Sequence, residues 1–396
     1  MAPPTHPPES LANSSKAWIV SGLMAAIVLI GTTGCSSFFM PVCQANNDCS
    51  SSGGGGGTGT SSSYAYVANA TLGTLVGFPV PTAGFKTLTG SSYNIGTPPI
   101  ALAATPKGTF LYVALDSGDV FLYTIGSNGV LTLGNAGSPV ASTLNGTGMS
   151  MTVDPTGNWL FMVSNSIDAL LEYQINASTG VLTQVGQTSG IPLNAGSPTQ
   201  ICVTPNDQYV YVGLGIGGTD GFAFNSSTGA LANQIHVAPL GVASDNAIAA
   251  DNNSAYLFIG EAGKGIRAFT IGTGGVPKEI SGSPFASQLG PQSIVVDPTN
   301  TFVYVANKTA NVITGYTLGT GGTLTPLSSS PFSTGSQPIA MALDSTGKYL
   351  FVVNSGGSPD MQVFSFDATT AGKLDSVTSV ATGADPAGAV ALSVVP

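Results

Sequence analysis

The sequence predicts an all-β protein, a seven-bladed β-propeller of four-stranded antiparallel blades that is closed by its C-terminal strand. A short apolar strand with an aromatic residue near its start recurs seven times, at intervals of 46 to 50 residues. Each interval divides into four short β-rich runs separated by turn residues. A fixed period in this range is typical of repeat architectures, and four-stranded units of this size arranged around an axis form a propeller. The seven aromatic positions are Tyr66, Tyr112, Phe161, Tyr211, Phe258, Tyr304 and Phe351.

The composition suits short strands joined by tight turns. Of the 396 residues only 7% are charged, whereas glycine alone accounts for 53. The formal net charge is −10, and the nine lysine and arginine residues are scattered along the chain. Because nucleic-acid binding relies on clustered basic residues that neutralise phosphates, nucleic acid is excluded as a partner.

Residues 1–34 are predicted to be a lipoprotein signal peptide. Lys16 precedes an apolar run at 17–30, which is short for a membrane span and typical of a signal peptide. The small residues before Cys35 resemble a bacterial lipobox, in which this cysteine is lipidated. Thr32 stands where that motif usually has leucine, so an uncleaved anchor or a simple secreted form stays open. The expected location is the bacterial cell envelope, periplasmic or surface-exposed, with the membrane as a partner through the lipid anchor.

Residues 35–63 are predicted to be a flexible tether, because they are rich in serine and glycine and contain little that could pack. The tether contains Cys43 and Cys49, which an oxidising compartment would allow to pair as a disulfide. The alternative is that both stay free. Cys202 lies in an apolar strand and is predicted to be a buried, unreactive thiol.

The propeller itself is predicted to span residues 64–396. In the repeat that begins at Ser293, strands are expected at 293–297, 301–306 and 312–317, and from 323 onward. Glycine, proline, aspartate and asparagine between these runs are typical of β-turns. No segment of the repeat region keeps a helical period over three turns.

The two ends of the propeller predict how the ring closes. The first repeat opens at Tyr64 with the second-strand pattern and lacks a first strand. Residues 389–394 resemble the first strands at 100–104 and 339–343, yet have no partner in their own repeat. Pairing this last strand with the first blade removes the exposed edges. Since a closed ring hides its edges, a monomer is expected.

Three recurring motifs carry a family resemblance. They are the Tyr-Val-Ala-Asn strand, the Asp-Pro-Thr-Gly or Asp-Ser-Thr-Gly turn at 154–157 and 344–347, and the Ser-Thr-Gly-x-Leu turn at 178–182 and 227–231. The chain resembles the lactonase-type seven-bladed propellers, which include bacterial 6-phosphogluconolactonase and the YVTN-repeat surface proteins. The resemblance covers residues 64–396 and implies the fold. The matched residues are structural, so lactone hydrolysis is only one of the functions that it implies.

The turns of a meander alternate between two faces of the propeller. Turns between strands one and two, and between three and four, share a first face. Five aspartates there are predicted to bond their own turn backbone: Asp154, Asp207, Asp251, Asp297 and Asp344. The second face, formed by the other turns and the blade connections, is predicted to bind a ligand through Asn69, Asp116, Asn165, Asp245, Asn307, Asn354 and Asp385.

Amide and carboxylate oxygens in a ring suit a sugar-like ligand or a hard cation such as Ca²⁺. No calcium motif is present, so neither a cofactor nor a metal site is predicted. The alternative is that asparagine and aspartate are simply common in short loops.

Lactone hydrolysis requires a base that activates water and a group that stabilises the oxyanion. His236 and Arg267 are the only histidine and arginine of residues 64–396, and Glu261 lies between them in sequence. These three are the catalytic candidates. His236 is expected near an outer strand, where a surface histidine is the alternative. A phosphorylated substrate is disfavoured, because phosphate sites normally use arginine or lysine forks or a helix N-terminus.

The glycine-rich stretch at 260–265 lacks the spacing of a phosphate loop and is predicted to be a β-turn. Two functions remain open on the sequence alone. The favoured one is a lipid-anchored propeller that binds a ligand or partner on its second face. The alternative is a lactone hydrolase, so whether the protein is an enzyme is left open.

Overall fold

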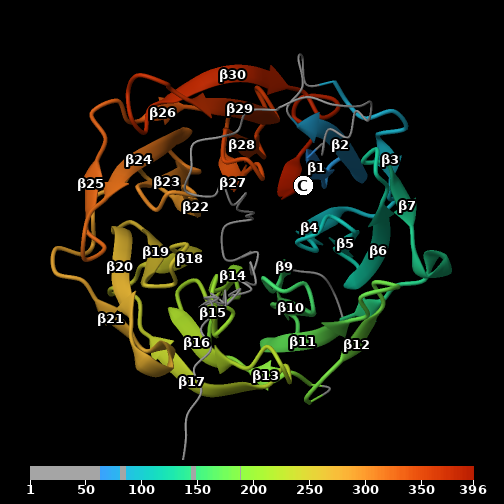
Figure 1. Cartoon of the computed structure of the whole chain (residues 1–396), viewed down its shortest axis with the longest axis horizontal. Helices are drawn as coiled ribbons and strands as arrows, with labels where there is room; N and C mark the ends of the chain where they lie inside the picture. Colours follow the sequence, from blue (N-terminus) through green and yellow to red (C-terminus); the bar gives the residue numbers. More distant parts are fainter. Residues whose placement is uncertain (1–62, 81–85, 144–148, 188) are drawn as a thin grey trace, which may run out of the picture. The chain divides into compact units, whose positions relative to one another are not determined.

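Seven antiparallel sheets surround a central axis, which confirms the propeller predicted from the repeat (Figure 1). The structure is a computed structural model, and it describes residues 63–80, 86–143, 149–187 and 189–396. The predicted signal peptide, nearly all of the predicted tether, and Cys35, Cys43 and Cys49 lie outside these ranges. Within them, no helix has the length and apolar character needed to cross a membrane.

Each blade has four main strands, which follow one another from the axis outward. Blade 1 contains β31 (Ala389–Val395), β1 (Ser63–Asn69), β2 (Thr74–Val80) and β3 (Tyr93–Asn94). Blade 2 contains β4 (Pro99–Ala104), β5 (Phe110–Leu115), β6 (Asp119–Ile125) and β7 (Leu131–Leu133), and β8 (Ala141–Ser142) pairs with β6. Blade 3 contains β9 (Ser150–Val153), β10 (Trp159–Ser164), β11 (Ala169–Ile175) and β12 (Leu182–Gln184), and β13 (Ile191–Pro192) pairs with β11.

The remaining blades repeat this plan. Blade 4 contains β14 (Gln200–Val203), β15 (Tyr209–Gly213), β16 (Thr219–Phe224) and β17 (Leu231–Val237). Blade 5 contains β18 (Ser244–Ala250), β19 (Tyr256–Ala262), β20 (Gly265–Ile271) and β21 (Pro277–Glu279). Blade 6 contains β22 (Pro291–Val296), β23 (Phe302–Asn307), β24 (Val312–Leu318) and β25 (Leu324–Pro326), and β26 (Phe332–Ser333) pairs with β24. Blade 7 contains β27 (Pro338–Leu343), β28 (Tyr349–Asn354), β29 (Met361–Phe366) and β30 (Leu374–Val380).

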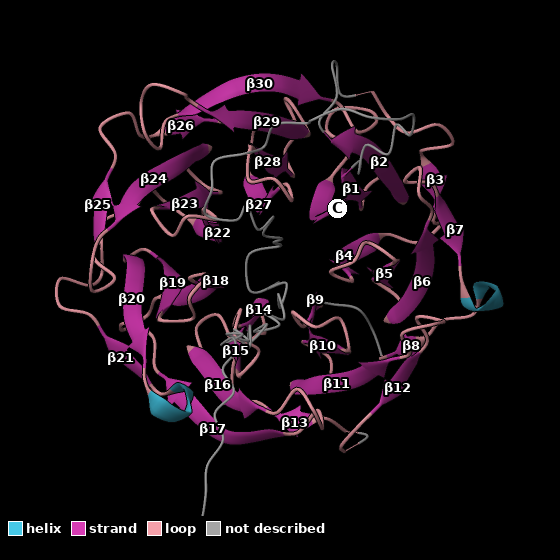
Figure 2. Ribbon diagram, in the orientation of Figure 1, coloured by secondary structure: helices cyan, strands magenta, loops and turns pink. Residues whose placement is uncertain are grey.

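The C-terminal strand closes the ring as predicted. β31 pairs antiparallel with β1, and the paired residues include Tyr66 with Ser393 and Ala68 with Ala391. Figure 2 shows the all-β character, since the two helical segments drawn are single 3₁₀ turns at Asn135–Gly137 and Thr273–Gly275. The stretch at 260–265 forms the β19–β20 hairpin, as expected.

Neighbouring blades are joined by hydroxyl groups of the repeated aromatic residue. Tyr66, Tyr112, Tyr211 and Tyr304 each donate a hydrogen bond of 2.6 to 2.8 Å to a glycine carbonyl in the next blade. Burial raises the pKa of each of these tyrosines, so the hydroxyl keeps its proton. Blade 3 has Phe161 at this position, and there the indole of Trp159 donates to Ser226 O at 2.7 Å.

The accepting glycines belong to turns between strands three and four. Gly322 occupies the equivalent turn of blade 6, with a φ of +80°. A Cβ built there would lie 2.7 Å from Tyr256 Cδ1 of the preceding blade, closer than real Cβ contacts allow. Glycine is therefore required both for the backbone conformation and for the close approach of the two blades.

Four of the five first-face aspartates cap their turns as predicted. Asp251 Oδ1, for example, accepts from the backbone N–H groups of Ala255 and Tyr256, both at 2.6 Å. The prediction is wrong for Asp207, which lies at the last turn position with a φ of +59°. Thr204 caps that turn instead, through Oγ1 at 3.0 Å from Tyr209 N. Burial and the nearby Asp154 charge raise the pKa of Asp207 to about 7.

Cys202 departs in part from its prediction. It is completely buried on β14, as expected, but it is disulfide-bonded rather than a free thiol. An apolar strand environment indicates burial, whereas it does not indicate whether another cysteine can reach the same place.

We predict that Gly322→Ala destabilises the propeller more than Gly321→Ala does. Both glycines have positive φ, near +80°, so alanine costs about 1 kcal/mol at each. Only Gly322 is packed against the neighbouring blade, where overpacking adds about 1 to 3 kcal/mol, while a Cβ at Gly321 meets open space. Thermal unfolding followed by circular dichroism should give the larger fall in midpoint for Gly322→Ala. Equal falls would show that the blade contact contributes nothing.

Candidate functional site

Two of the three predicted catalytic residues lie together in blade 5. Arg267 Nη1 donates to Glu261 Oε1 at 3.0 Å, across the paired strands β19 and β20. The arginine also binds Glu279 on β21 through two hydrogen bonds of 2.8 and 3.0 Å. Glu261 is completely buried and Arg267 is 5% exposed. Both side chains are therefore taken up by an internal ion-pair network.

This network ties blade 5 to the connection from blade 4. Arg267 donates to Ala238 O at 2.8 Å, and Leu240 N donates to Glu261 Oε1 at 3.2 Å. Burial opposes the charge of Arg267, but hydrogen bonds to Glu279 and Glu261 outweigh it and raise its pKa. The hydrogen bonds from Arg267 to Glu279 lower the pKa of Glu279, although the partial burial of Glu279 acts in the opposite direction. The guanidinium is therefore held between two carboxylates and a backbone carbonyl.

A second buried carboxyl faces Glu261. Asp245 on β18 is paired with Glu261 in the sheet register, and the two carboxyl groups interact directly. Thr219 donates to Asp245 Oδ2 at 2.7 Å. Asp245 Oδ1 and Glu261 Oε2 have no donor among the described residues. Burial raises the pKa of Asp245 to about 7. The bond from Thr219 opposes this shift, and the charge of Glu261 adds to it.

His236 does not join Glu261 and Arg267 in this network. It lies on β17, the outermost strand of blade 4, where Nδ1 is 2.8 Å from Asp220 Oδ1. Asp220 is completely buried and also accepts from Asn194 and Gln234. Because a carboxylate only accepts, Nδ1 carries the proton and Nε2 is left as a base on a side chain that is 37% exposed.

Most of the predicted ligand-binding amides are occupied within the protein. Asn69, Asn307 and Asn354 are completely buried at the ends of second strands. Asn69 bonds Thr382, which links the first blade to the last connection of the chain. Asn307 and Asn354 bond loop carbonyls and hydroxyls in the same way. A ligand would have to displace these bonds to reach them.

The other predicted positions differ in exposure. Asp116 is exposed in the β5–β6 turn, and Asp385 is exposed and accepts from Ser358 N at 2.7 Å. Asn165 Oδ1 is buried and has no donor in the described ranges. Those same ranges contain no group of three or more histidine, cysteine or acidic side chains placed to hold a metal ion.

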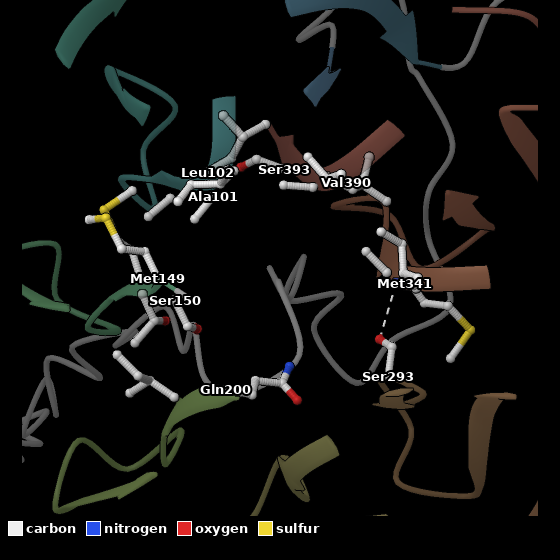
Figure 3. A pocket seen from close by; sticks show the side chains of 18 of the residues that line it. Ala101, Leu102, Met149, Ser150, Gln200, Ser293, Met341, Val390 and Ser393 are labelled. Atoms are coloured by element: carbon white, nitrogen blue, oxygen red, sulfur yellow. Dashed lines mark hydrogen bonds between the residues drawn. The ribbon is translucent and has the colours of Figure 1, made fainter. Parts of the chain in front are cut away.

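The innermost strands surround a cavity in the central channel, with a volume of about 400 Å³. Figure 3 shows Ala101, Ser150, Gln200, Ser293 and Val390 around its opening. All come from innermost strands. Three further polar residues line it from blades 5 and 6: Asn246, Gln292 and Lys308. A volume of this size lies in the range of small-molecule sites.

The polar lining of the channel offers donors. Gln200 Oε1 accepts from Ile248 N at 2.9 Å, and no described residue accepts from its NH₂ group. Asn246 Oδ1 accepts from Ser244 Oγ at 2.7 Å, and its NH₂ group likewise has no acceptor in the part of the chain that the structure describes. Lys308 Nζ makes no ion pair with any described residue. The sequence assigns Gln200, Gln292 and Lys308 to the second face. It does not separate them from the other polar residues of that face, because only the closed ring brings them to the axis.

The comparisons with known proteins agree with this architecture. A family model described as "Lactonase, 7-bladed beta-propeller" matches residues 64–390. No protein of curated function matches the sequence.

Solved structures with the same fold are similar over most of the chain. A candidate 6-phosphogluconolactonase from Bacteroides fragilis has a TM-score of 0.66 and 18% identity, covering 86% of this chain and 100% of that one. A second candidate from Bacteroides uniformis has a TM-score of 0.65 and 15% identity, covering 85% and 100%. The periplasmic gluconolactonase PpgL of Pseudomonas aeruginosa has a TM-score of 0.64 and 15% identity, covering 85% and 99%. At such low identity these likenesses show a shared fold alone.

We predict that Asp245→Asn stabilises the protein at pH 8. Between about pH 4 and pH 7 the unfolded chain ionises Asp245 while the folded chain keeps its proton, so this group makes the wild type less stable as pH rises. The substituted amide still accepts from Thr219 and can donate to Glu261 Oε2. The gain at pH 8 should be about 1 to 3 kcal/mol and should vanish near pH 4.

Thermal unfolding midpoints from pH 4 to pH 8 test this prediction. Asp116→Asn is the matched control, because it removes the same charge at an exposed position on the same face. A wild type that is more stable than Asp245→Asn at pH 8 would mean that the carboxylate has partners that outweigh its burial.

Proposed function

The chain belongs to the lactonase family of seven-bladed β-propellers, and we propose that it binds a small lactone, or the hydroxy acid derived from one, at the second-face mouth of its channel. The supporting observation is the set of free donors on Gln200, Asn246 and Lys308 in a cavity of about 400 Å³. Ring oxygens, carbonyls and carboxylates are acceptors. Such a ligand would accept hydrogen bonds from these donors.

Binding without turnover is the function we favour, because the candidate acid–base groups lie away from the cavity. None of Glu261, Arg267 and His236 lines the channel. They lie on the second, third and fourth strands of their blades, counted from the axis. Glu261 and Arg267 are also buried and bonded to each other, so neither is free to act on a ligand at the innermost strands.

Lactone hydrolysis is the second candidate function, and one observation favours it. The Asp220–His236 pair has the form of an oriented general base, with a buried carboxylate on Nδ1 of a partly exposed histidine. If this pair were catalytic, the substrate would bind on the outer side of blade 4 rather than in the channel.

We predict that a panel of lactones and hydroxy acids binds to the purified protein and is not consumed. Calorimetric titration measures affinity, and NMR of the same samples over hours measures turnover. Gln200→Ala should weaken binding roughly fivefold to tenfold, equivalent to about one hydrogen bond. The control is Gln187→Ala, which changes an exposed glutamine that does not line the cavity.

Two outcomes would change the proposal. Turnover that His236→Gln abolishes would establish the hydrolase instead. If the Gln200→Ala variant binds these compounds as strongly as the wild type does, the ligand does not bind in the channel.

We also propose that the protein is exported and held to the cell envelope through lipidated Cys35. The support is the signal-like segment at 17–30 with the small residues before Cys35. PpgL, a protein of the same fold, is described as periplasmic. A lipid anchor would place the propeller outside the cytoplasm, with the tether setting its distance from the membrane.

Cys35→Ser is predicted to move the protein from the membrane fraction to the soluble fraction of the cell envelope. Radiolabelled palmitate should be incorporated into the wild type and not into the variant. Asn46→Ser, in the same predicted tether, is the control and should leave both readouts as they are. Membrane association that survives Cys35→Ser would point to an uncleaved anchor.

A further inference from the structure

The channel mouth is built from one equivalent residue of each innermost strand. In every blade the repeated aromatic residue pairs with one residue of the innermost strand, for example Tyr66 with Ser393 and Phe258 with Ala249. The residue three positions earlier lies toward the second face. We call these seven residues the mouth ring: Ile100, Met149, Thr199, Asn246, Gln292, Ile339 and Val390. All of them line the cavity.

The mouth ring is divided into two continuous arcs. Blades 4, 5 and 6 contribute the polar arc of Thr199, Asn246 and Gln292. Blades 7, 1, 2 and 3 contribute the apolar arc, which consists of Ile339, Val390, Ile100 and Met149. Since blade 7 adjoins blade 1, each arc is unbroken around the axis. One half of the mouth is therefore aliphatic and the other half is able to form hydrogen bonds.

The second layer of the channel keeps this division only in part. One residue further along the strands, blades 7, 1 and 2 of the apolar half have the small side chains of Ala340, Ala391 and Ala101, whereas blade 3 has Ser150. The polar half has Gln200, with its free NH₂ group, and Ser293. Lys308 adds a positive charge on the polar side, and it is the one charged residue among those that line the cavity.

We propose that the ligand is an amphiphile: a lactone or hydroxy acid that carries an aliphatic chain. This inference rests on the proposed function and specifies its ligand class. The oxygen-rich head would lie against the polar arc and Lys308, and the chain against Ile339, Val390 and Ile100. A sugar lactone carries hydroxyl groups on every side, so some of them would face the apolar arc without partners. Unpaired polar groups of that kind are strongly penalised.

The experiment compares affinities within one chemical series. Calorimetric titration of the purified protein uses γ-butyrolactone, its derivatives with two, four, six and eight added methylenes, the matching hydroxy acids, and glucono-δ-lactone. We expect affinity to rise about twofold to fourfold per methylene until the cavity is filled, and to fall beyond that length. The hydroxy acids should lose affinity with added salt and in Lys308→Met, because their carboxylate faces the ammonium group.

Two variants of the apolar arc test the placement of the chain. Val390→Thr preserves side-chain volume and should reduce the increase in affinity per added methylene. Ile339→Ser should reduce it as well. Val242→Ser is the control, since it changes a 95% exposed aliphatic residue in the β17–β18 connection, outside the cavity. The Val242→Ser variant should show the same increase in affinity per methylene as the wild type. The thermal midpoint of each variant shows whether it is folded.

The failures of the two proposals are distinguishable. If no lactone or hydroxy acid binds, the proposed function is wrong. If they bind, but glucono-δ-lactone binds as tightly as the alkyl lactones or chain length has no effect, the function stands and the amphiphilic ligand is wrong. The increase in affinity per methylene could also be the same in Val390→Thr, Ile339→Ser and the wild type. That result would show that the aliphatic chain does not lie against the apolar arc.

Discussion

The packing of one aromatic ring against one glycine turn is the contact on which the propeller depends. The six turn glycines of blades 2 to 7 all have positive φ, and a Cβ at any of them would approach an aromatic ring of the preceding blade to less than 3.0 Å. Among the described residues the strands of different blades share no ladder, and blades 4 and 5 are linked by a single backbone bridge between Gly215 and Asp245. The ring is therefore held together mainly by these contacts, the tyrosine hydrogen bonds and the apolar cores between blades. β31 then closes it. Every side chain at the axis is placed as a consequence.

The same constraint explains why polar residues gather at the ends of second strands. Each strand leaves the packed interior there, and the loops that follow carry unpaired backbone groups that must be satisfied. Asn69, Asn307 and Asn354 bond those loops, and in blade 5 Glu261 does so with the help of Arg267. Asp245 is the exception, because only one oxygen of its buried carboxyl has a donor, Thr219, while the other has none among the described residues and a second carboxyl, that of Glu261, lies nearby. It is the one place in this set where stability depends on a proton.

The channel mouth, by contrast, meets few of these structural demands. Of its seven residues only Met149 is buried, and the others are partly exposed at the inner edge of the sheets. Thr199 is the member that also joins two blades, because its hydroxyl donates to Asp245 O at 2.8 Å. The mouth residues can therefore differ between blades without changing the core. This separation between packed blades and a variable axis is the physical reason why one fold serves different functions in different proteins. In this protein the variable positions at the axis are the seven residues of the mouth ring, where we propose that the ligand binds.

The repeat alone determined the number of blades, the order of their strands and the closure by residues 389–394, because these follow from local patterns of period two and from turn residues within one repeat. The scarcity of histidine and arginine grouped His236, Glu261 and Arg267 as catalytic candidates, and of these only Glu261 and Arg267 are bonded to each other, within one hairpin of adjacent strands. The partner of His236 and the structural use of the asparagines were missed, since each depends on a neighbour in a different strand or loop. The mouth ring was missed for the same reason on a larger scale: Ile100 and Asn246 are ordinary strand residues in sequence, and only the closed ring brings residues of seven repeats to one axis.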